Sequence, residues 1–167
     1  MKKYLVGTLL AITAIGFGAT ASAETKSSLT AEEIEAVLTE AGLGPTMTED
    51  AATGTPVASG SVGELLFWVR ALDCGGAPVA CENLMFFANF DLGRNVAPSD
   101  YRVINSFNDS QLFGRAYILE NGNQVGVDYV IDLGGGVTEA HLSNNISRWA
   151  DVVAAFIAKF SAGAAGS

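Results

Sequence analysis

The sequence is poor in the residues that most catalytic and metal sites require. Among 167 residues there are two cysteines and one histidine, His141. A structural zinc site takes four cysteine or histidine ligands, and the chain offers three. Serine–histidine–aspartate catalysis would depend on His141, and no G-x-S-x-G segment accompanies it. We therefore expect His141 to be an ordinary helix residue, and we predict no metal and no cofactor.

Loops that bind phosphate or calcium are missing as well. The glycine run 134–136 has neither the G-x-G-x-x-G spacing nor a following Lys-Ser/Thr pair. No D-x-[DN]-x-[DN]-G loop is present. A turn that needs positive φ accounts for the three glycines.

Carboxylates are the one reactive group that the chain has in quantity. Asp128 and Asp132 lie on one expected strand, and Asp91 and Glu120 end two others. Paired carboxylates can hydrolyse glycosides, but acids on the solvent face of a strand usually only raise solubility. The alternative function is therefore a small periplasmic enzyme or ligand-binding protein that uses surface carboxylates such as Asp91 and Asp128.

Basic residues are few. Nine Lys and Arg residues stand against 18 Asp and Glu residues, which gives a formal net charge of −9 at pH 7. Nucleic acids and anionic lipids both attract basic surfaces, so neither is an expected partner. The acids are scattered along the chain, which favours a role in solubility.

The longest apolar stretch lies at the N-terminus. Lys2 and Lys3 precede an apolar segment, 5–19, and residues 21–23 read Ala-Ser-Ala. These are the parts of a secretory signal peptide, so we predict cleavage after Ala23 and a periplasmic or secreted mature protein. A retained anchor is the alternative, but the stretch is short for a spanning helix. Cleavage leaves seven basic and 18 acidic residues, a net charge of −11, and no membrane anchor.

Cys74 and Cys81 are separated by six residues, which is not the C-x-x-C spacing of a thioredoxin-type pair. Paired cysteines of exported proteins are usually oxidised. Gly75, Gly76 and Pro78 between them are turn residues. We therefore predict a structural disulfide at the mouth of a β-hairpin, where opposed residues lie within disulfide range.

Periodicity and capping signals predict one α+β domain. A capping box, Thr30 with Glu33, opens the first helix, and apolar spacing predicts a long last helix from Thr138 to Phe160. The domain should cover 30–160, after a flexible leader, 24–29, and before a disordered tail, 161–167. Between the two helices we expect strands at 47–50, 56–60, 65–72 and 84–90, a helix at 98–108, and strands at 115–120 and 125–133, in the order α-β-β-β-β-α-β-β-α.

Two of the expected strands, 65–72 and 84–90, are apolar at nearly every position. Such runs are typical of central strands buried on both faces, and this is the first interpretation. The second is an exposed apolar surface for another protein. Its candidate residues are Trp68, Phe86 and Phe87.

Several segments together resemble the YbjN family of bacterial proteins. They are Leu65–Cys74, Cys81–Phe90, Val103–Asn108, Arg115–Ile118 and Asp128–Val137. The resemblance implies a fold like that of type III secretion chaperones, with helices packed on a twisted antiparallel sheet of about six strands. Members are described as sensory transduction regulators, and no catalytic residues are attributed to the family. The signal peptide sets this chain apart from many members.

Asn105 and Asn108 lie in one of the similar segments. Asparagines here are expected to cap the helix end and to bond with the following loop. The alternative is that they form the polar rim of a peptide-binding groove.

The leading hypothesis is a non-enzymatic, chaperone-like interaction module in the periplasm. It would bind a protein or peptide partner, or a second copy of itself as a homodimer.

Overall fold

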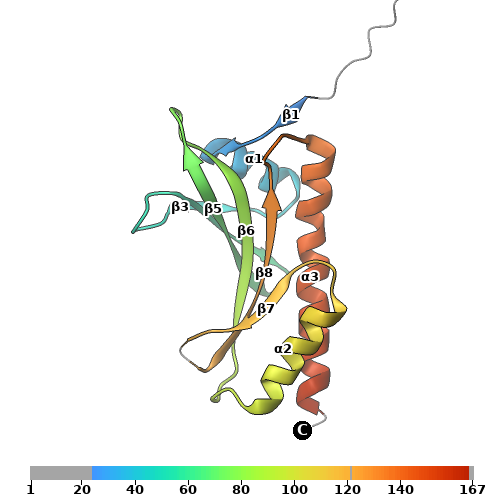
Figure 1. Cartoon of the computed structure of the whole chain (residues 1–167). Coiled ribbons are helices and arrows are strands. Elements are labelled where there is room, and N and C mark those ends of the chain that lie inside the picture. The colour runs from blue at the N-terminus through green and yellow to red at the C-terminus, as the bar shows by residue number, and fades with distance from the viewer. Residues whose placement is uncertain (1–23, 121, 166–167) are drawn as a thin grey trace, which may run out of the picture.

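The computed structural model describes residues 24–120 and 122–165 of the chain (Figure 1). The predicted signal peptide, 1–23, lies outside these residues. The helices are α1 (Ala31–Glu40), α2 (Pro98–Ser110) and α3 (Glu139–Ala165). The strands are β1 (Thr25–Lys26), β2 (Leu29–Thr30), β3 (Thr46–Glu49), β4 (Pro56–Val62), β5 (Leu65–Gly75), β6 (Ala80–Asp91), β7 (Arg115–Ile118), β8 (Gln124–Asp132) and β9 (Val137–Thr138). Without the short strands β1, β2 and β9, this is the predicted order.

Antiparallel pairing joins seven of the strands into one sheet. Their order is β3-β4-β5-β6-β8-β7, and β2 pairs with β6 close to the point where β8 ends. The remaining two strands, β1 and β9, form a separate two-stranded sheet. The predicted α+β class, with a large antiparallel sheet and three helices, is confirmed.

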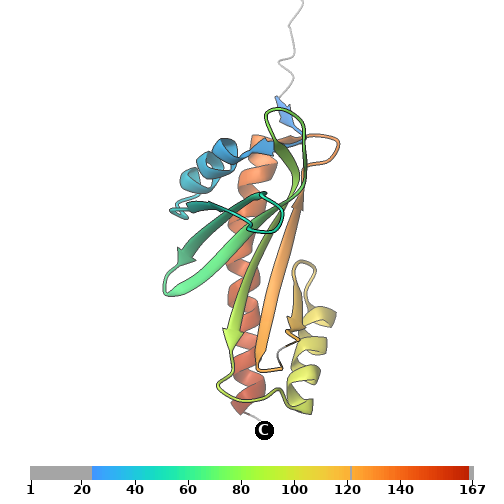
Figure 2. The same cartoon turned by 90° about the vertical axis from the view of Figure 1, so that its left-hand side faces the viewer.

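Helix α3 packs along one face of the large sheet (Figures 1 and 2). Its Trp149 is fully buried, and its ring centre lies 6.0 Å from that of Phe67 on β5 and 5.9 Å from that of Phe86 on β6. Burial of an aromatic side chain of this size contributes about 1.5–3 kcal/mol. Helix α2 packs beside β7 and against α3. Within the described ranges no helix is both long and apolar enough to cross a membrane.

The predicted disulfide is present. Cys74 on β5 lies directly opposite Cys81 on β6, and the two sulfurs are bonded. Both strands run further than predicted, because the hairpin continues past the disulfide to the pair Gly75 and Ala80. The bond therefore closes the end of the hairpin, where a short loop gives it a modest stabilising effect.

The two ends of the domain differ from prediction. The segment 24–29 was predicted to be a flexible leader, but it contains β1 and the first residue of β2, Leu29, which is fully buried. Local sequence could not show this, because β1 and β2 pair with segments far along the chain. The predicted tail is also corrected, since α3 continues through Ala165. The segment was predicted to be disordered because its residues are small, but alanine has the highest helix propensity of all residues.

Carboxylates complete the N-termini of α1 and α2. At α1 the predicted capping box is confirmed: Thr30 Oγ1 accepts from Glu33 N at 3.3 Å, and Glu33 Oε2 accepts from Thr30 N at 2.9 Å. At α2 the buried carboxylate of Asp100 accepts from Ala97 N at 2.7 Å and from two guanidinium nitrogens of Arg94 at 2.7 and 2.9 Å. The hydrogen bond with Arg94 is the main reason that the pKa of Asp100 is lowered.

We predict that Asp100→Asn destabilises the protein at pH 7 by about 1–3 kcal/mol, since it weakens a buried, charge-assisted hydrogen-bond set. A lowered native pKa contributes stability that is fully present above the unfolded value, about 3.9, and is lost as pH falls through the native value. The gap between wild type and Asp100→Asn should therefore narrow between pH 7 and pH 3 in urea unfolding. Asp109→Asn, an exposed change on the same helix, is the control and should stay within about 0.5 kcal/mol. An equal loss at both pH values would contradict this account.

Candidate interaction surface

One face of the large sheet carries no helix. Figure 2 looks onto this face, with α3 behind the sheet. Side chains on a strand alternate between faces, so every second residue of the central strands points away from α3. We call this surface the open face. Its residues are Leu66, Trp68, Arg70 and Leu72 on β5, Asn83, Met85, Phe87 and Asn89 on β6, and Gly126, Asp128, Val130 and Asp132 on β8.

The prediction that strands 65–72 and 84–90 are buried on both faces is therefore wrong. Burial alternates along β5 and β6. Phe86 is fully buried against Trp149 on the covered face, so it is not part of the open face. Trp68 and Phe87 are a directly opposed cross-strand pair on the open face, only half-buried, with stacked rings 5.8 Å apart. Leu66 is 62% exposed, and Val130 is 48% exposed.

A shallow hollow of about 320 Å³ adjoins the stacked pair. It is lined by Thr48, Glu49, Asp50, Val57, Trp68, Arg70, Phe87 and Asn89. The guanidinium of Arg70 lies 5.6 Å from the centre of the Phe87 ring and 3.8 Å from Asp50 Oδ2. Its Nε is buried and has no hydrogen-bond partner. The hollow thus combines aromatic surface with the side chain of Arg70.

The part of the open face over β7 and β8 is more closed than the sequence predicted. Asp128 was expected on the solvent-exposed face of its strand, but its exposed fraction is only 5%. Arg115 lies across it and donates to both carboxylate oxygens. Gly126 is buried beneath the ring of Tyr117, whose hydroxyl donates to Asn89 Oδ1 at 3.2 Å. Burial raises the pKa of Tyr117, which keeps the phenol neutral.

The acids proposed for the enzyme alternative do not converge. Asp128 lies opposite Phe87, four residues along β6 from Asp91, so the two acids are about 13 Å apart along the sheet. Asp91 accepts from Gly93 N at 2.7 Å, at the end of its strand. His141 is exposed at the start of α3. Among residues 24–120 and 122–165, no three His, Cys, Asp or Glu side chains are grouped so that they could hold a metal.

The two asparagines lie on α2, away from the open face. Asn105 is exposed. Asn108 binds both backbone groups of Ala116: its Oδ1 accepts from Ala116 N at 2.8 Å, and its Nδ2 donates to Ala116 O at 3.1 Å. The side-chain amide therefore takes the place of a neighbouring strand along the outer edge of β7.

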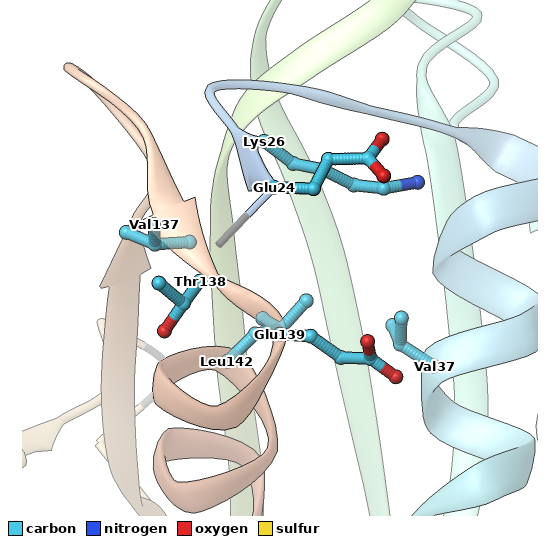
Figure 3. A pocket seen from close by; sticks show the side chains of 7 residues that line it. All are labelled: Glu24, Lys26, Val37, Val137, Thr138, Glu139 and Leu142. Carbon is cyan, nitrogen blue, oxygen red and sulfur yellow. The ribbon is translucent and has the colours of Figure 1, made fainter. Parts of the chain in front are cut away.

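A second pocket, of about 220 Å³, was not predicted (Figure 3). It is lined by Glu24, Lys26, Val37, Val137, Thr138, Glu139 and Leu142. Val37, Val137 and Leu142 supply apolar surface, and the ammonium of Lys26 is bound to Glu33, which raises the pKa of Lys26. The pocket forms where β1 pairs with β9, two segments far apart in the sequence, so no local sequence motif predicts it.

The fold first defines a class of protein: an α+β domain with one large antiparallel sheet, helices on one face of that sheet, and no cluster of reactive side chains among the described residues. Within that class the chain belongs to the YbjN family, whose model, described as "Putative bacterial sensory transduction regulator", matches residues 30–162. It is also similar to the crystal structure of YbjN, a putative transcription regulator from E. coli. That match has 14% identity and a TM-score of 0.52, and it covers 83% of this chain and 97% of the other. No curated protein matches the sequence.

Tyr117 and Gly126 offer a direct test of how the open face is built. A Cβ on Gly126 would lie 2.5 Å from Cζ of Tyr117 and 2.7 Å from Oδ1 of Asn89, so Gly126→Ala must displace these two side chains, which are hydrogen-bonded to each other. We expect a loss of about 1–3 kcal/mol in the free energy of unfolding, measured in urea. Gly75→Ala is the matched control, because nothing lies within 4 Å of its added Cβ, and it should cost little. Equal effects of the two changes would show that Tyr117 does not depend on the glycine.

Proposed function

We propose that the mature chain is an exported, non-enzymatic, chaperone-like module that binds a protein or peptide partner through its open face. One observation carries the proposal: a helix-free sheet face on which Trp68, Phe87, Leu66 and Val130 remain in contact with solvent. Contiguous apolar surface of this kind is costly in water and commonly marks an interaction site. Trp and Arg are also the residue types that contribute most to binding at protein interfaces, and Trp68 and Arg70 lie side by side on this face.

Export is supported by the sequence and is compatible with the fold. Cleavage after Ala23 would leave Glu24 as the first residue, directly before β1, so processing would remove none of the described elements. The bonded pair Cys74 and Cys81 also suits an oxidising compartment.

A regulatory role is part of the proposal. The matched family is described as a sensory transduction regulator, and the similar E. coli protein is described as a putative transcription regulator. A mature chain with seven basic and 18 acidic residues has no surface charge suited to DNA. We infer that any regulation by this chain acts through protein contacts.

The alternative of an enzyme or ligand-binding protein has weaker support. Its acids Asp91 and Asp128 are far apart, and Asp128 is already neutralised by Arg115. The pocket near Glu24 and Glu139 could hold a small molecule, but it contains neither a histidine nor a cysteine.

Affinity capture tests the binding role. The oxidised mature chain, used as bait in an envelope extract with brief crosslinking, should retain a specific protein partner. Phe87→Asp should abolish that capture, because it places a charge in the stacked pair with Trp68. Tyr101→Asp adds the same charge at an exposed position on α2 and should leave capture unchanged. Recovery of crosslinked dimers of the bait, without another protein, would indicate a homodimer, and identical capture by both variants would remove the open face from the proposal.

Export has its own test. When the full chain is expressed with a C-terminal tag, N-terminal sequencing of the envelope fraction should begin at Glu24, and the mass should fit one disulfide. Ala23→Pro should block processing, because signal peptidase requires a small residue at the cleavage site. A cytoplasmic, unprocessed wild-type chain would contradict the proposed location.

A further inference from the structure

The strands at one edge of the sheet are unequal in length. β7 pairs only with residues 125–128 of β8, whereas β8 continues to Asp132. In Figure 2 the chain turns away from the sheet at the start of β7, and the remaining half of β8 has no strand on that side. The edge of β8 at residues 129–132 is thus left unpaired, between the start of β7 and the turn that leads to β9. We call this stretch the β8 gap.

The register shows which backbone groups face this gap. Leu119 N donates to Gln124 O at 3.0 Å in the β7–β8 hairpin, so every second residue of β8 from Gln124 onward directs its N–H and C=O towards β7. On the other side, Leu133 N donates to Glu82 O at 2.9 Å, which sets the alternate residues towards β6. Val130 and Asp132 therefore direct their backbone groups into the gap. No strand or side chain in the described ranges is bonded to those groups.

Two other edges of the sheet, those of β7 and β3, are less receptive. The outer edge of β7 is occupied at Ala116 by the side-chain amide of Asn108. The edge strand β3 has four residues, three of them exposed, and it carries Glu49 but no large exposed apolar side chain. Short, charged edge strands discourage pairing with another chain. The unpaired edge of β8 carries one acid, Asp132, but exposed apolar side chains flank it.

Apolar side chains surround the gap. A hollow of about 360 Å³ is lined there by Leu112, Phe113, Gly114, Arg115, Asp128, Tyr129 and Val130. Leu112 is 86% exposed and Phe113 is 40% exposed. The ring of Phe113 is held between Arg148, whose guanidinium lies 4.1 Å from its centre, and the edge of Tyr129, 6.2 Å away. An incoming strand would meet a preformed apolar contact beside its hydrogen bonds.

We propose that the β8 gap binds an extended segment of a different protein as an added antiparallel strand, in line with β7. Val130 and Asp132 supply the hydrogen bonds, and alternate apolar side chains of the segment contact Val130 on the open face. Phe113, which packs on Tyr129 and Arg148, adjoins the segment on the side of α3. Only a polypeptide backbone has donors and acceptors at this spacing, which specifies the kind of ligand. The negative charge of the mature chain, together with Asp132 in the gap, favours a neutral or basic segment over a second copy of this chain. This inference rests on the proposed function and specifies where and how the partner binds.

A proline substitution isolates the backbone contribution. Val130→Pro removes an N–H that has no partner in the free protein, and proline is tolerated at such edge positions. Val130→Thr keeps that N–H and the β-branched shape, and is the matched control. The probe is a phage-displayed library of random 12-residue peptides, selected on the oxidised mature chain. Selected peptides should be apolar at alternate positions. Their affinity should fall about tenfold or more in Val130→Pro and by less than about threefold in Val130→Thr.

Amide hydrogen exchange on the wild-type chain gives a second readout that needs no variant. The amides of Val130 and Asp132 should become protected when a selected peptide is added. Peptides that bind Val130→Pro as well as wild type, or that protect other amides only, would overturn the edge site. If those peptides did not bind Phe87→Asp, the open face would remain the proposed binding surface although the edge site was rejected. Self-association that is lost in Val130→Pro would make a second copy the occupant and overturn the proposed partner. Failure of both the library and the affinity capture would reject the edge site together with the proposed function.

Discussion

A single layer of helices can cover only one face of a sheet, and most features of this protein depend on that constraint. The apolar side of α3 is centred on Trp149, which packs on Phe67 and Phe86. Because neighbouring strand residues point to opposite faces, the packing that buries Phe86 necessarily turns Phe87 outward. The stacked pair of Trp68 and Phe87 is thus a direct consequence of the core on the other side.

The same architecture makes the edges of the sheet important. A sheet that is open on one face has little else to shield its outer strands. In this protein one edge is hydrogen-bonded by a side chain and another is left unpaired. Asn108 satisfies the outer edge at Ala116, while β8 extends four residues past its partner. Val130 belongs to both surfaces, since its side chain lies on the open face and its backbone faces the gap. Binding at the edge and binding on the face would therefore involve adjoining surfaces of one site.

Several predictions from sequence hold because each depends on residues that are close in the chain. The capping box of Thr30 and Glu33 needs only one helical turn, and the disulfide needs only a hairpin. The long last helix follows from its own apolar spacing. The errors have the opposite origin. Leu29 and Asp128 are buried by strands or side chains from other segments, and no local pattern reveals those neighbours.

The sequence by itself determined the order of the elements, the α+β class and the disulfide, because periodicity, caps and turn residues act over a few positions. It also marked Trp68 and Phe87 as apolar strand residues, but it could not separate them from Phe86. That separation was decided only by the tertiary structure, since which face of a strand is buried depends on where α3 packs. The gap beside β8 was decided there too, because an open edge results from strand pairing and register between segments and not from any property of β8 alone.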